Sequence, residues 1–379
     1  YKKTRIKKTR CKFEFTIKAN DIISLPKKEL PIPLKICSFD IEASSSHGDF
    51  PMPKKTYKKL AGELQQYWTK YKEDIEKLSL ASKRNLLQRQ LKTAFELFSD
   101  EELLKSPPCE GISKVFTKDE YLIDTFRDND CPIIIKSGMQ GILKKSNCDE
   151  EISSTGQTWM SCIKAKRKNR DGKDYAVIDC LLDDIDPADK VDQIDAVLIQ
   201  ILPELEGDKV TFIGSTFWKV GDDKPYLNHG VCLNTCTDYG GNEIQIVPCE
   251  TETDLLLGWT KMIQEEQPDV IIGYNIFGFD YKFMCDRAEE LDCEKEFYDL
   301  GRIIDKTYKR ENQDKEKDLK YLRRNKRLEK ELRIASGAHQ LTYINIEGII
   351  QIDLYNYFRR EVNLGSYKLQ DVASHFIGD

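Results

Sequence analysis

Residues 36–42 read Ile36-Cys37-Ser38-Phe39-Asp40-Ile41-Glu42 and place two acidic residues inside an apolar stretch. In a β-strand, positions i and i+2 point to the same face, so Asp40 and Glu42 share one side while Phe39 and Ile41 face a core. Two neighbouring carboxylates repel each other and lose hydration, so they need cations, and hard divalent ions prefer such oxygen ligands. A solvent-facing acidic pair on an edge strand is the alternative.

A second acidic side chain follows another apolar stretch further along the chain. Residues 270–274 predict a buried strand, and Asn275 then leads through a glycine-containing turn to Asp280. The glycines allow tight backbone turns, and Asn275 could bond the loop backbone or a substrate. We expect Asp280 to open a helix over 280–291, where an ordinary N-cap is its alternative role.

Tyr367 and Asp371 form a third candidate pair. We expect a helix over 367–376, and residues four apart on a helix share one face. A phenol hydroxyl beside a carboxylate can orient a water molecule held on a metal ion; the alternative is a plain hydrogen bond on a surface helix. Together with the two earlier segments, and in this order, the pair favours a metal-dependent enzyme.

These three segments resemble the Exo I, Exo II and Exo III motifs of family B DNA polymerases. The matching residues are Phe39–Glu42, Asn275–Asp280 (Asn-x-x-x-Phe-Asp) and Tyr367–Asp371 (Tyr-x-x-x-Asp). Including flanking text, the resemblance covers residues 31–53 and 208–379. Because all three motifs occur in the same order, the resemblance is highly specific.

The resemblance implies an α/β chain with the ribonuclease H-like exonuclease fold of the DEDD superfamily, in which helices flank a mixed sheet. It also implies proofreading, that is, 3′–5′ hydrolysis of the terminal phosphodiester with two divalent metal ions, Mg or Mn. The implied catalytic residues are Asp40, Glu42, Asp280, Tyr367 and Asp371. The four carboxylates among them would bind the metals, and Tyr367 would place the attacking water.

The resemblance assigns Asn275 and Phe279 to a substrate-contacting loop, with core packing as the alternative for Phe279. Asp353 matches another acidic position of the family, which we interpret as structural. The expected partners are the single-stranded 3′ end of a primer-template and the palm, fingers and thumb of a longer parent chain, with a processivity factor as a further candidate. Palm motifs are absent from the sequence, so we expect no DNA synthesis from it.

Four segments make up the expected domain organisation. Residues 1–33 are the remnant of an N-terminal domain, and the exonuclease domain comprises 34–53 and 208–379. The interval of about 150 residues after the first motif is longer than a compact domain needs, so we interpret 54–207 as an insertion. Apolar residues at helical spacing predict that 56–104 is helical. Insertions of this size resemble those in polymerases of large DNA viruses.

Strand and helix patterns alternate after residue 208, which favours an α/β fold around a mixed sheet. The expected strands are 209–218, 228–234, 243–248 and 270–274, and the expected helices are 252–266, 280–291 and 355–360. The charged stretch 306–333 predicts an exposed helix or helical hairpin. Residues 340–346 and 349–354 predict two strands joined by a tight turn.

Composition narrows the functional classes. The 379 residues carry a formal net charge of −6 with a pI of about 5.6, so contacts with DNA must rest on local basic patches or bound cations. No apolar run approaches the ~20 residues that cross a bilayer, and no secretory signal is visible. We therefore expect an intracellular protein without a membrane partner, in a nucleus or at a viral replication site. The first residue, Tyr1, suggests a piece of a longer chain.

Two other functions fit the same residues. One is a catalytically silent exonuclease-fold module that binds DNA or serves as a scaffold. The other is a free-standing DEDD nuclease that acts on RNA. The presence of all four carboxylates and Tyr367 argues against the first, and the match around the third motif favours a polymerase over the second.

Overall fold

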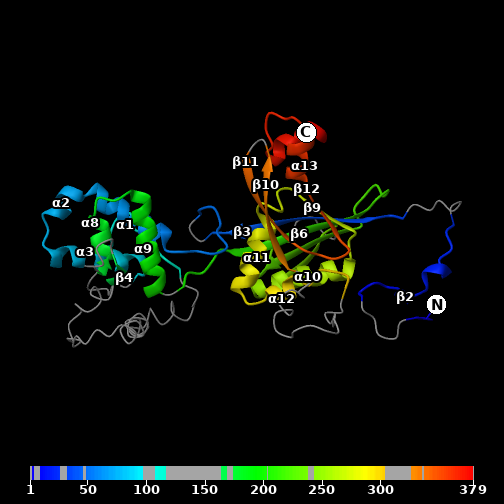
Figure 1. Cartoon of the computed structure of the whole chain (residues 1–379), viewed down its shortest axis with the longest axis horizontal. Coiled ribbons are helices and arrows are strands. Elements are labelled where there is room, and N and C mark those ends of the chain that lie inside the picture. Colours follow the sequence, from blue (N-terminus) through cyan, green and yellow to red (C-terminus); the bar gives the residue numbers. More distant parts are fainter. Residues whose placement is uncertain are drawn as a thin grey trace. The chain divides into compact units, whose positions relative to one another are not determined.

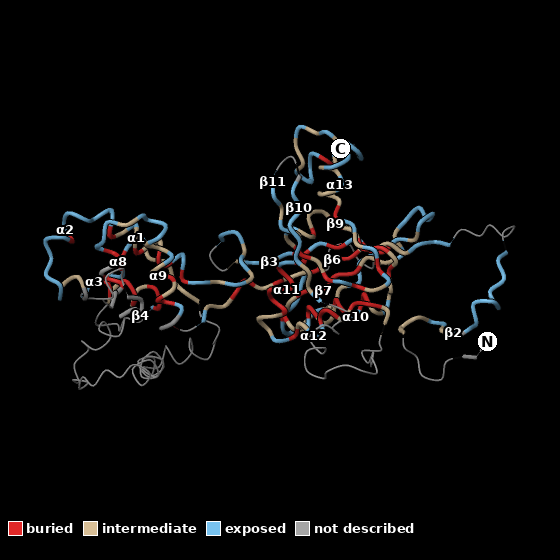
Figure 2. The backbone as a smooth tube through the Cα atoms, in the orientation of Figure 1, coloured by how far each residue is buried: buried red, intermediate tan, exposed pale blue. Residues whose placement is uncertain are grey.

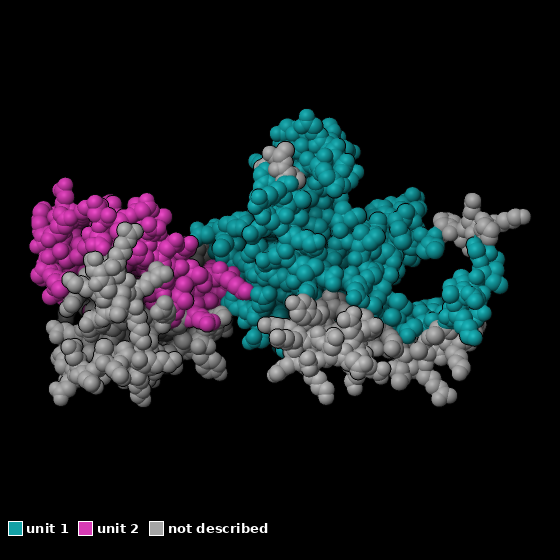
Figure 3. Space-filling model, in the orientation of Figure 1, with its two compact units in different colours: residues 1–53, 208–379 teal, residues 54–207 magenta. Residues whose placement is uncertain are grey.

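The computed structural model describes residues 2–3, 9–25, 32–45, 48–96, 107–116, 164–168, 174–202, 204–237, 243–303, 326–334 and 337–378. The chain forms two compact units (Figure 3). Residues 1–53 together with 208–379 make up the first unit, and residues 54–207 make up the second. Each unit has its own hydrophobic core, as separately packed units require. All expected site residues belong to the first unit.

A six-stranded mixed sheet forms the centre of the first unit (Figure 1). Its strands, in spatial order, are β12 (Ile350–Asp353), β9 (Val270–Gly273), β3 (Lys35–Ser44), β6 (Lys209–Lys219), β7 (Leu227–Leu233) and β8 (Gln245–Cys249). Strands β12, β9 and β3 are parallel, β6 is antiparallel to both β3 and β7, and β7 is parallel to β8. The mixed α/β architecture expected from the sequence is confirmed.

Helices complete the first unit. They are α10 (Glu252–Glu266), α11 (Asp280–Glu290), α12 (Glu294–Phe297), α13 (Leu354–Glu361) and α14 (Leu369–Phe376). Helix α10 begins as its sequence predicts, because Thr251 caps it by accepting a hydrogen bond from the Asp254 amide (3.1 Å). It ends at Gln267, whose φ of 49° is left-handed and stops the helix before Pro268. Helix α10 packs on β6 and β7.

The core lies between the sheet and helices α10 to α12 (Figure 2). Phe39 is buried on the inward face of β3, and its ring lies 5.1 Å from Trp259 of α10 and 5.3 Å from Tyr281 of α11. Aromatic pairs at this spacing add about 0.5–1.5 kcal/mol each beyond the area they bury. Phe39 and Ile41, which alternate with the two acids of β3, therefore fix the strand against the core, so that the acids point to the opposite face.

Two expectations about the last third of the chain are wrong. Residues Arg327–Ile334 form a strand, β10, not a helix, and β10 pairs antiparallel with β11 (Gly337–Ile344). Strand β12 pairs with β9 rather than with β11. Tertiary contacts override local propensity here, because the Thr342 amide of β11 donates to the Phe277 carbonyl (2.8 Å) and anchors the hairpin to the first unit. Residues 306–325 of the expected helix lie outside the described residues.

The described part of the second unit is mainly helical. It contains α1 (Lys58–Lys70), α2 (Lys72–Glu76), α3 (Leu80–Ala94), α8 (Val177–Leu182) and α9 (Pro187–Ile201), with a short pair of strands, β4 (Lys164–Lys168) and β5 (Asp174–Ala176). Its core includes Leu64 and Trp68 of α1 and Leu91 of α3. The Trp68 indole N–H donates to the side-chain oxygen of buried Gln90 (2.9 Å), so this donor and this acceptor are paired inside the core.

The N-terminal segment contacts the rest of the first unit through a short backbone pairing. Thr9 bridges to Ile303, and the Arg10 guanidinium donates to the Asp299 carboxylate (2.7 Å). Before it comes a two-residue strand, β1 (Lys2–Lys3), which pairs with β2 (Phe15–Thr16). Among the described helices, none is both long and apolar enough to cross a membrane.

Candidate active site

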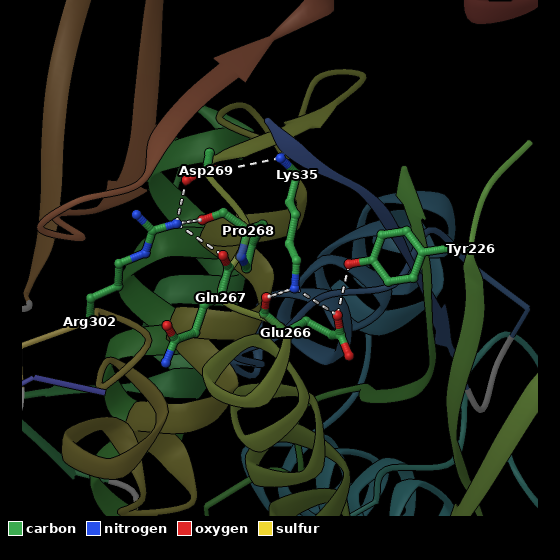
Figure 4. A network of polar contacts seen from close by, with 7 residues as sticks. All are labelled: Lys35, Tyr226, Glu266, Gln267, Pro268, Asp269 and Arg302. Atoms are coloured by element: carbon green, nitrogen blue, oxygen red, sulfur yellow. Dashed lines mark hydrogen bonds and ion pairs between the residues drawn. The ribbon is translucent and has the colours of Figure 1, made fainter. Parts of the chain in front are cut away.

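Two of the candidate acids, Asp40 and Asp280, lie together just beyond the last pair between the parallel strands β3 and β9. Parallel strands place their carboxyl ends at one edge of the sheet, and such edges commonly bind ligands in open α/β sheets. The amino ends are closed by a different network (Figure 4). Lys35 donates to the Glu266 carbonyl (2.9 Å), while Asp269 accepts from the Lys35 amide (2.9 Å) and from Arg302 (2.6 Å).

Asp40 and Glu42 lie on the exposed face of β3. Strand β3 has β9 on one side and β6 on the other, so it is an interior strand and the edge-strand alternative is wrong. The residue opposite Asp40 on β6 is Gly214. Because Gly214 has no side chain, nothing from that cross-strand position covers the Asp40 carboxylate.

Asp280 contacts β3 directly and is 2% exposed. Helix α11 has Phe279 as its N-cap, so the N-cap alternative for Asp280 is wrong. Strand β3 pairs with β9 only as far as Ser38. Further along β3, the Ile41 amide donates a hydrogen bond to Asp280 Oδ1 (3.2 Å). The Asp280 side chain also bonds to Asp40, and burial followed by the Asp40 charge raises the pKa of Asp280 to about 8. Two carboxylates this close hold either a shared proton or a cation between them.

The loop that carries Asp280 is held by Asp353, the last residue of β12. Asp353 Oδ1 accepts from the amides of Asn275 (2.9 Å) and Tyr355 (2.9 Å). Its Oδ2 accepts from the Phe277 amide (3.0 Å) and the Asn356 side chain (3.0 Å). With four donors, the buried carboxylate is fully occupied by protein. These contacts support the structural interpretation of Asp353.

Asn275 and Phe279 occupy the two ends of the turn before α11. Asn275 has a left-handed φ of 63°, and its carbonyl accepts from the amides of Gly278 and Phe279 (both 2.9 Å). A Cβ at Gly278 would lie 2.3 Å from the Asn275 side-chain oxygen, so the glycine makes room for it. The Phe279 ring is half-buried and lies 5.5 Å from Phe283 and 5.6 Å from Phe50. Phe279 thus packs on the core and still presents part of its surface.

The third candidate pair is arranged differently from the prediction. Helix α14 begins at Leu369, so Tyr367 precedes it and the two residues do not share a helix face; that prediction is wrong. The Tyr367 hydroxyl donates to the Val362 carbonyl (2.8 Å) and accepts from the Leu364 amide (3.2 Å), which ties it to its own loop. Asp371 lies exposed in the first turn of α14 and accepts from Ser366.

The structure therefore brings Asp40 and Asp280 together and leaves Asp371 on a separate, exposed helix. Across the described residues, no three His, Cys, Asp or Glu side chains lie close enough to hold a metal ion. The chemistry of the donors nevertheless suits a divalent ion. Asp40 and Asp280 are hard oxygen ligands whose mutual repulsion a cation would relieve.

Comparison with known proteins identifies the family. A match to the family described as DNA polymerase family B, exonuclease domain, covers residues 2–60 and 143–372. The DNA polymerase of Phaeocystis pouchetii virus is 31% identical over 399 residues, which cover 100% of this chain and 36% of that polymerase. The DNA polymerase of Pyramimonas orientalis virus is 32% identical over 372 residues, which cover 97% of this chain and 27% of that polymerase.

The chain belongs to the family B DNA polymerases, as their exonuclease domain. The DNA polymerase delta catalytic subunit of Candida albicans is also similar, at 34% identity over 179 residues, or 47% of this chain and 15% of that subunit. The chain spans 36% and 27% of the lengths of the two viral polymerases, so these relatives carry much additional sequence.

One functional support in this exonuclease domain was missed in the sequence. Arg287 of α11 is 1% exposed, and its Nε donates to Glu252 of α10 (2.9 Å). Glu252 also accepts from the Val210 amide of β6 (2.8 Å). The buried ion pair thus fixes α11, and with it Asp280, against the sheet. The only sequence signal was an arginine on the apolar side of a helix that otherwise buries Phe283, Met284 and Ala288.

Proposed function

We propose that this exonuclease domain removes nucleotides from the 3′ end of DNA and has the ribonuclease H-like fold of the DEDD superfamily. The observation that carries the proposal is the contact between Asp40 of β3 and Asp280 of α11 at the carboxyl ends of the parallel strands. Glu42 projects from the same face of β3 as Asp40, and Asp371 supplies the fourth acid from α14.

The proposed substrate is a single-stranded 3′ end, and the proposed cofactors are two divalent ions, Mg or Mn. Bound divalent ions would activate water and stabilise the leaving oxygen of an in-line displacement. Asp40, Glu42, Asp280 and Asp371 would hold them, which also answers the charge problem, since an acidic site otherwise repels phosphate. Asn275 and Phe279 would contact the terminal nucleotides, and Tyr367 would help to place the water.

Digestion of a 5′-labelled oligonucleotide tests this proposal. With Mg²⁺, the wild-type chain is expected to produce a ladder of shortened labelled products, because removal starts at the unlabelled end. Asp40→Ala and Asp280→Ala are expected to lower the rate by at least about a hundredfold, since each removes a charge-stabilising ligand. Asp223→Ala is the matched control, because Asp223 lies exposed in the turn between β6 and β7, at the other end of the sheet.

The outcomes separate this proposal from its alternatives. Wild-type rates in both Asp40→Ala and Asp280→Ala would refute the assignment of these acids. Binding of the oligonucleotide without any shortening would support a catalytically silent module. Faster digestion of an RNA strand than of DNA of the same sequence would support an RNA-directed nuclease. The other domains of a longer polymerase and a processivity factor remain proposed partners by similarity to the relatives.

A further inference from the structure

The segment that carries Tyr367 and Asp371 has a weaker hold on the core than the other motifs. In α14, Val372 is buried, whereas Leu369 is 57% exposed and Phe376 is 50% exposed. The Phe376 ring stacks on Phe358 of α13 at 4.9 Å, a contact between two surface helices. The position of Asp371 relative to the sheet therefore depends on a few specific contacts.

One of these contacts comes from Tyr274, which directly follows β9. The Tyr274 hydroxyl donates a hydrogen bond to the backbone carbonyl of Tyr367. Its ring lies 5.6 Å from Tyr355 of α13 in an edge-to-face arrangement. The bond thus joins the end of a central strand to the residue that leads into α14.

The surroundings of Tyr274 keep this donor in place. Burial raises the pKa of the phenol, and nearby Tyr355, Asp353 and Asp371 raise it further, so the hydroxyl stays protonated near neutral pH. A phenol has one proton to donate, and Tyr274 donates it to a backbone carbonyl. The bond therefore fixes the position of the main chain at Tyr367, whatever side chain stands there.

We propose that Tyr274 is a positioning residue that sets the place of the third motif: its hydroxyl ties the backbone at Tyr367 to the end of β9 and thereby aligns Asp371 with Asp40 and Asp280. This inference rests on the proposed nuclease function for its catalytic consequence, but the tie itself is a property of the fold. Small displacements of a ligand matter because metal-dependent displacement requires close alignment of its groups.

Tyr274→Phe removes the hydroxyl and keeps the ring against Tyr355. We expect kcat for oligonucleotide digestion to fall about tenfold and the Mg²⁺ concentration for half-maximal rate to rise several-fold, with KM for DNA changing less. The control is Tyr226→Phe, which deletes a hydroxyl bonded to Glu266 (2.7 Å) at the amino end of the sheet (Figure 4). We expect that control to keep the wild-type rate and Mg²⁺ requirement.

Hydrogen exchange supplies a readout that does not need activity. Mass spectrometry of peptides spanning 364–372 is expected to show several-fold faster amide exchange in Tyr274→Phe than in wild type or Tyr226→Phe, because the segment loses its tie. Unchanged exchange across 364–372 would overturn the proposal, as would wild-type kcat and Mg²⁺ dependence in an active enzyme. If the wild-type chain does not digest DNA, the proposed function fails, and exchange alone decides whether Tyr274 positions the segment.

Discussion

Replacing Asp353 with Asn tests how the catalytic loop is held. The substitution keeps the shape of the side chain but exchanges one acceptor oxygen for an NH₂ group. Each Asp353 oxygen accepts two hydrogen bonds, so the new amide nitrogen must face two donors: either the Asn275 and Tyr355 amides, or the Phe277 amide and the Asn356 side chain. Two of the four donors therefore lose their acceptor in either orientation.

The expected loss of stability follows from these contacts. An unsatisfied buried donor costs about 1–3 kcal/mol, and the lower half of that range applies because the four donors belong to half-buried residues. Two lost bonds therefore cost about 2–4 kcal/mol, and the two remaining bonds weaken because they lose charge assistance. Against a typical domain stability of about 5–15 kcal/mol, the first unit should still fold, with a looser loop around Asp280.

Urea unfolding combined with hydrogen exchange measures this effect. The chain has two units, so a single two-state fit does not apply, and exchange of peptides covering 274–281 reports on the loop itself. Asp186→Asn is the matched control. Asp186 caps α9 in the second unit by accepting from the Ala188 amide (2.8 Å), and an Asn side-chain oxygen can accept the same bond, so this change is expected to leave the stability of the second unit and the exchange of 274–281 nearly unchanged. Unchanged loop exchange in Asp353→Asn would show that this carboxylate does not hold the loop.

Three further predictions concern the loop, the buried ion pair and the insertion. Gly278→Ala places a methyl group against the side chain of Asn275, whose end can move aside, so we expect a stability change below about 1 kcal/mol. Because the Asn275 side chain is displaced, we expect KM for single-stranded DNA to rise several-fold. An unchanged KM would show that Asn275 does not contact the substrate. Arg287→Met leaves Glu252 buried without its cation, and we expect it to destabilise the first unit by about 3–5 kcal/mol in urea unfolding. The double variant Arg287→Met/Glu252→Gln should recover part of this loss. A loss below about 1 kcal/mol in Arg287→Met would contradict the role of the ion pair. Met52 and Asp208 exchange two hydrogen bonds (both 2.8 Å), so the two ends of the insertion already lie close together. Replacing 54–207 with a linker of about four Gly and Ser residues should therefore leave a soluble chain with a digestion rate within about threefold of wild type. An unfolded product on circular dichroism would contradict this.

Periodic burial made the central sheet predictable. The alternation around Phe39 and Ile41 predicted β3 and the shared face of its acids. The helix predicted over 252–266 has the observed ends, where it stops just before Pro268. Both signals are local, since a strand or helix that buries one face must repeat its apolar residues at a fixed spacing. The acid pair was correctly placed on one face, but the sequence could not show that β3 is an interior strand.

The errors arose where contacts distant in sequence decide the structure. The charged residues of 327–334 favour a helix locally, yet Arg327 pairs with Asp286 of α11 (2.6 Å) and the segment extends as β10. Tyr367 and Asp371 have helical spacing, but the hydroxyl of Tyr367 finds its partners in the preceding loop and the helix starts later. In both places the hydrogen bonds of a polar side chain, to a residue distant in sequence or to the backbone, decide the structure against the local preference for a helix.

The candidate acids differ in how many packing contacts must break to displace them. This difference explains how the single hydroxyl of Tyr274 can affect the position of Asp371. Asp280 begins a helix whose next residue, Tyr281, is fully buried, so displacing it would disturb the core. Asp371 lies in the first turn of an exposed helix, and displacing it breaks few contacts. We therefore expect a substitution near Asp280 mainly to lower the free energy of unfolding. A substitution that loosens α14 should instead shift the position of Asp371 while costing little stability. Tyr274 links the two regions, because it directly follows the central strand β9 and its hydroxyl donates to the backbone carbonyl of Tyr367, just before α14.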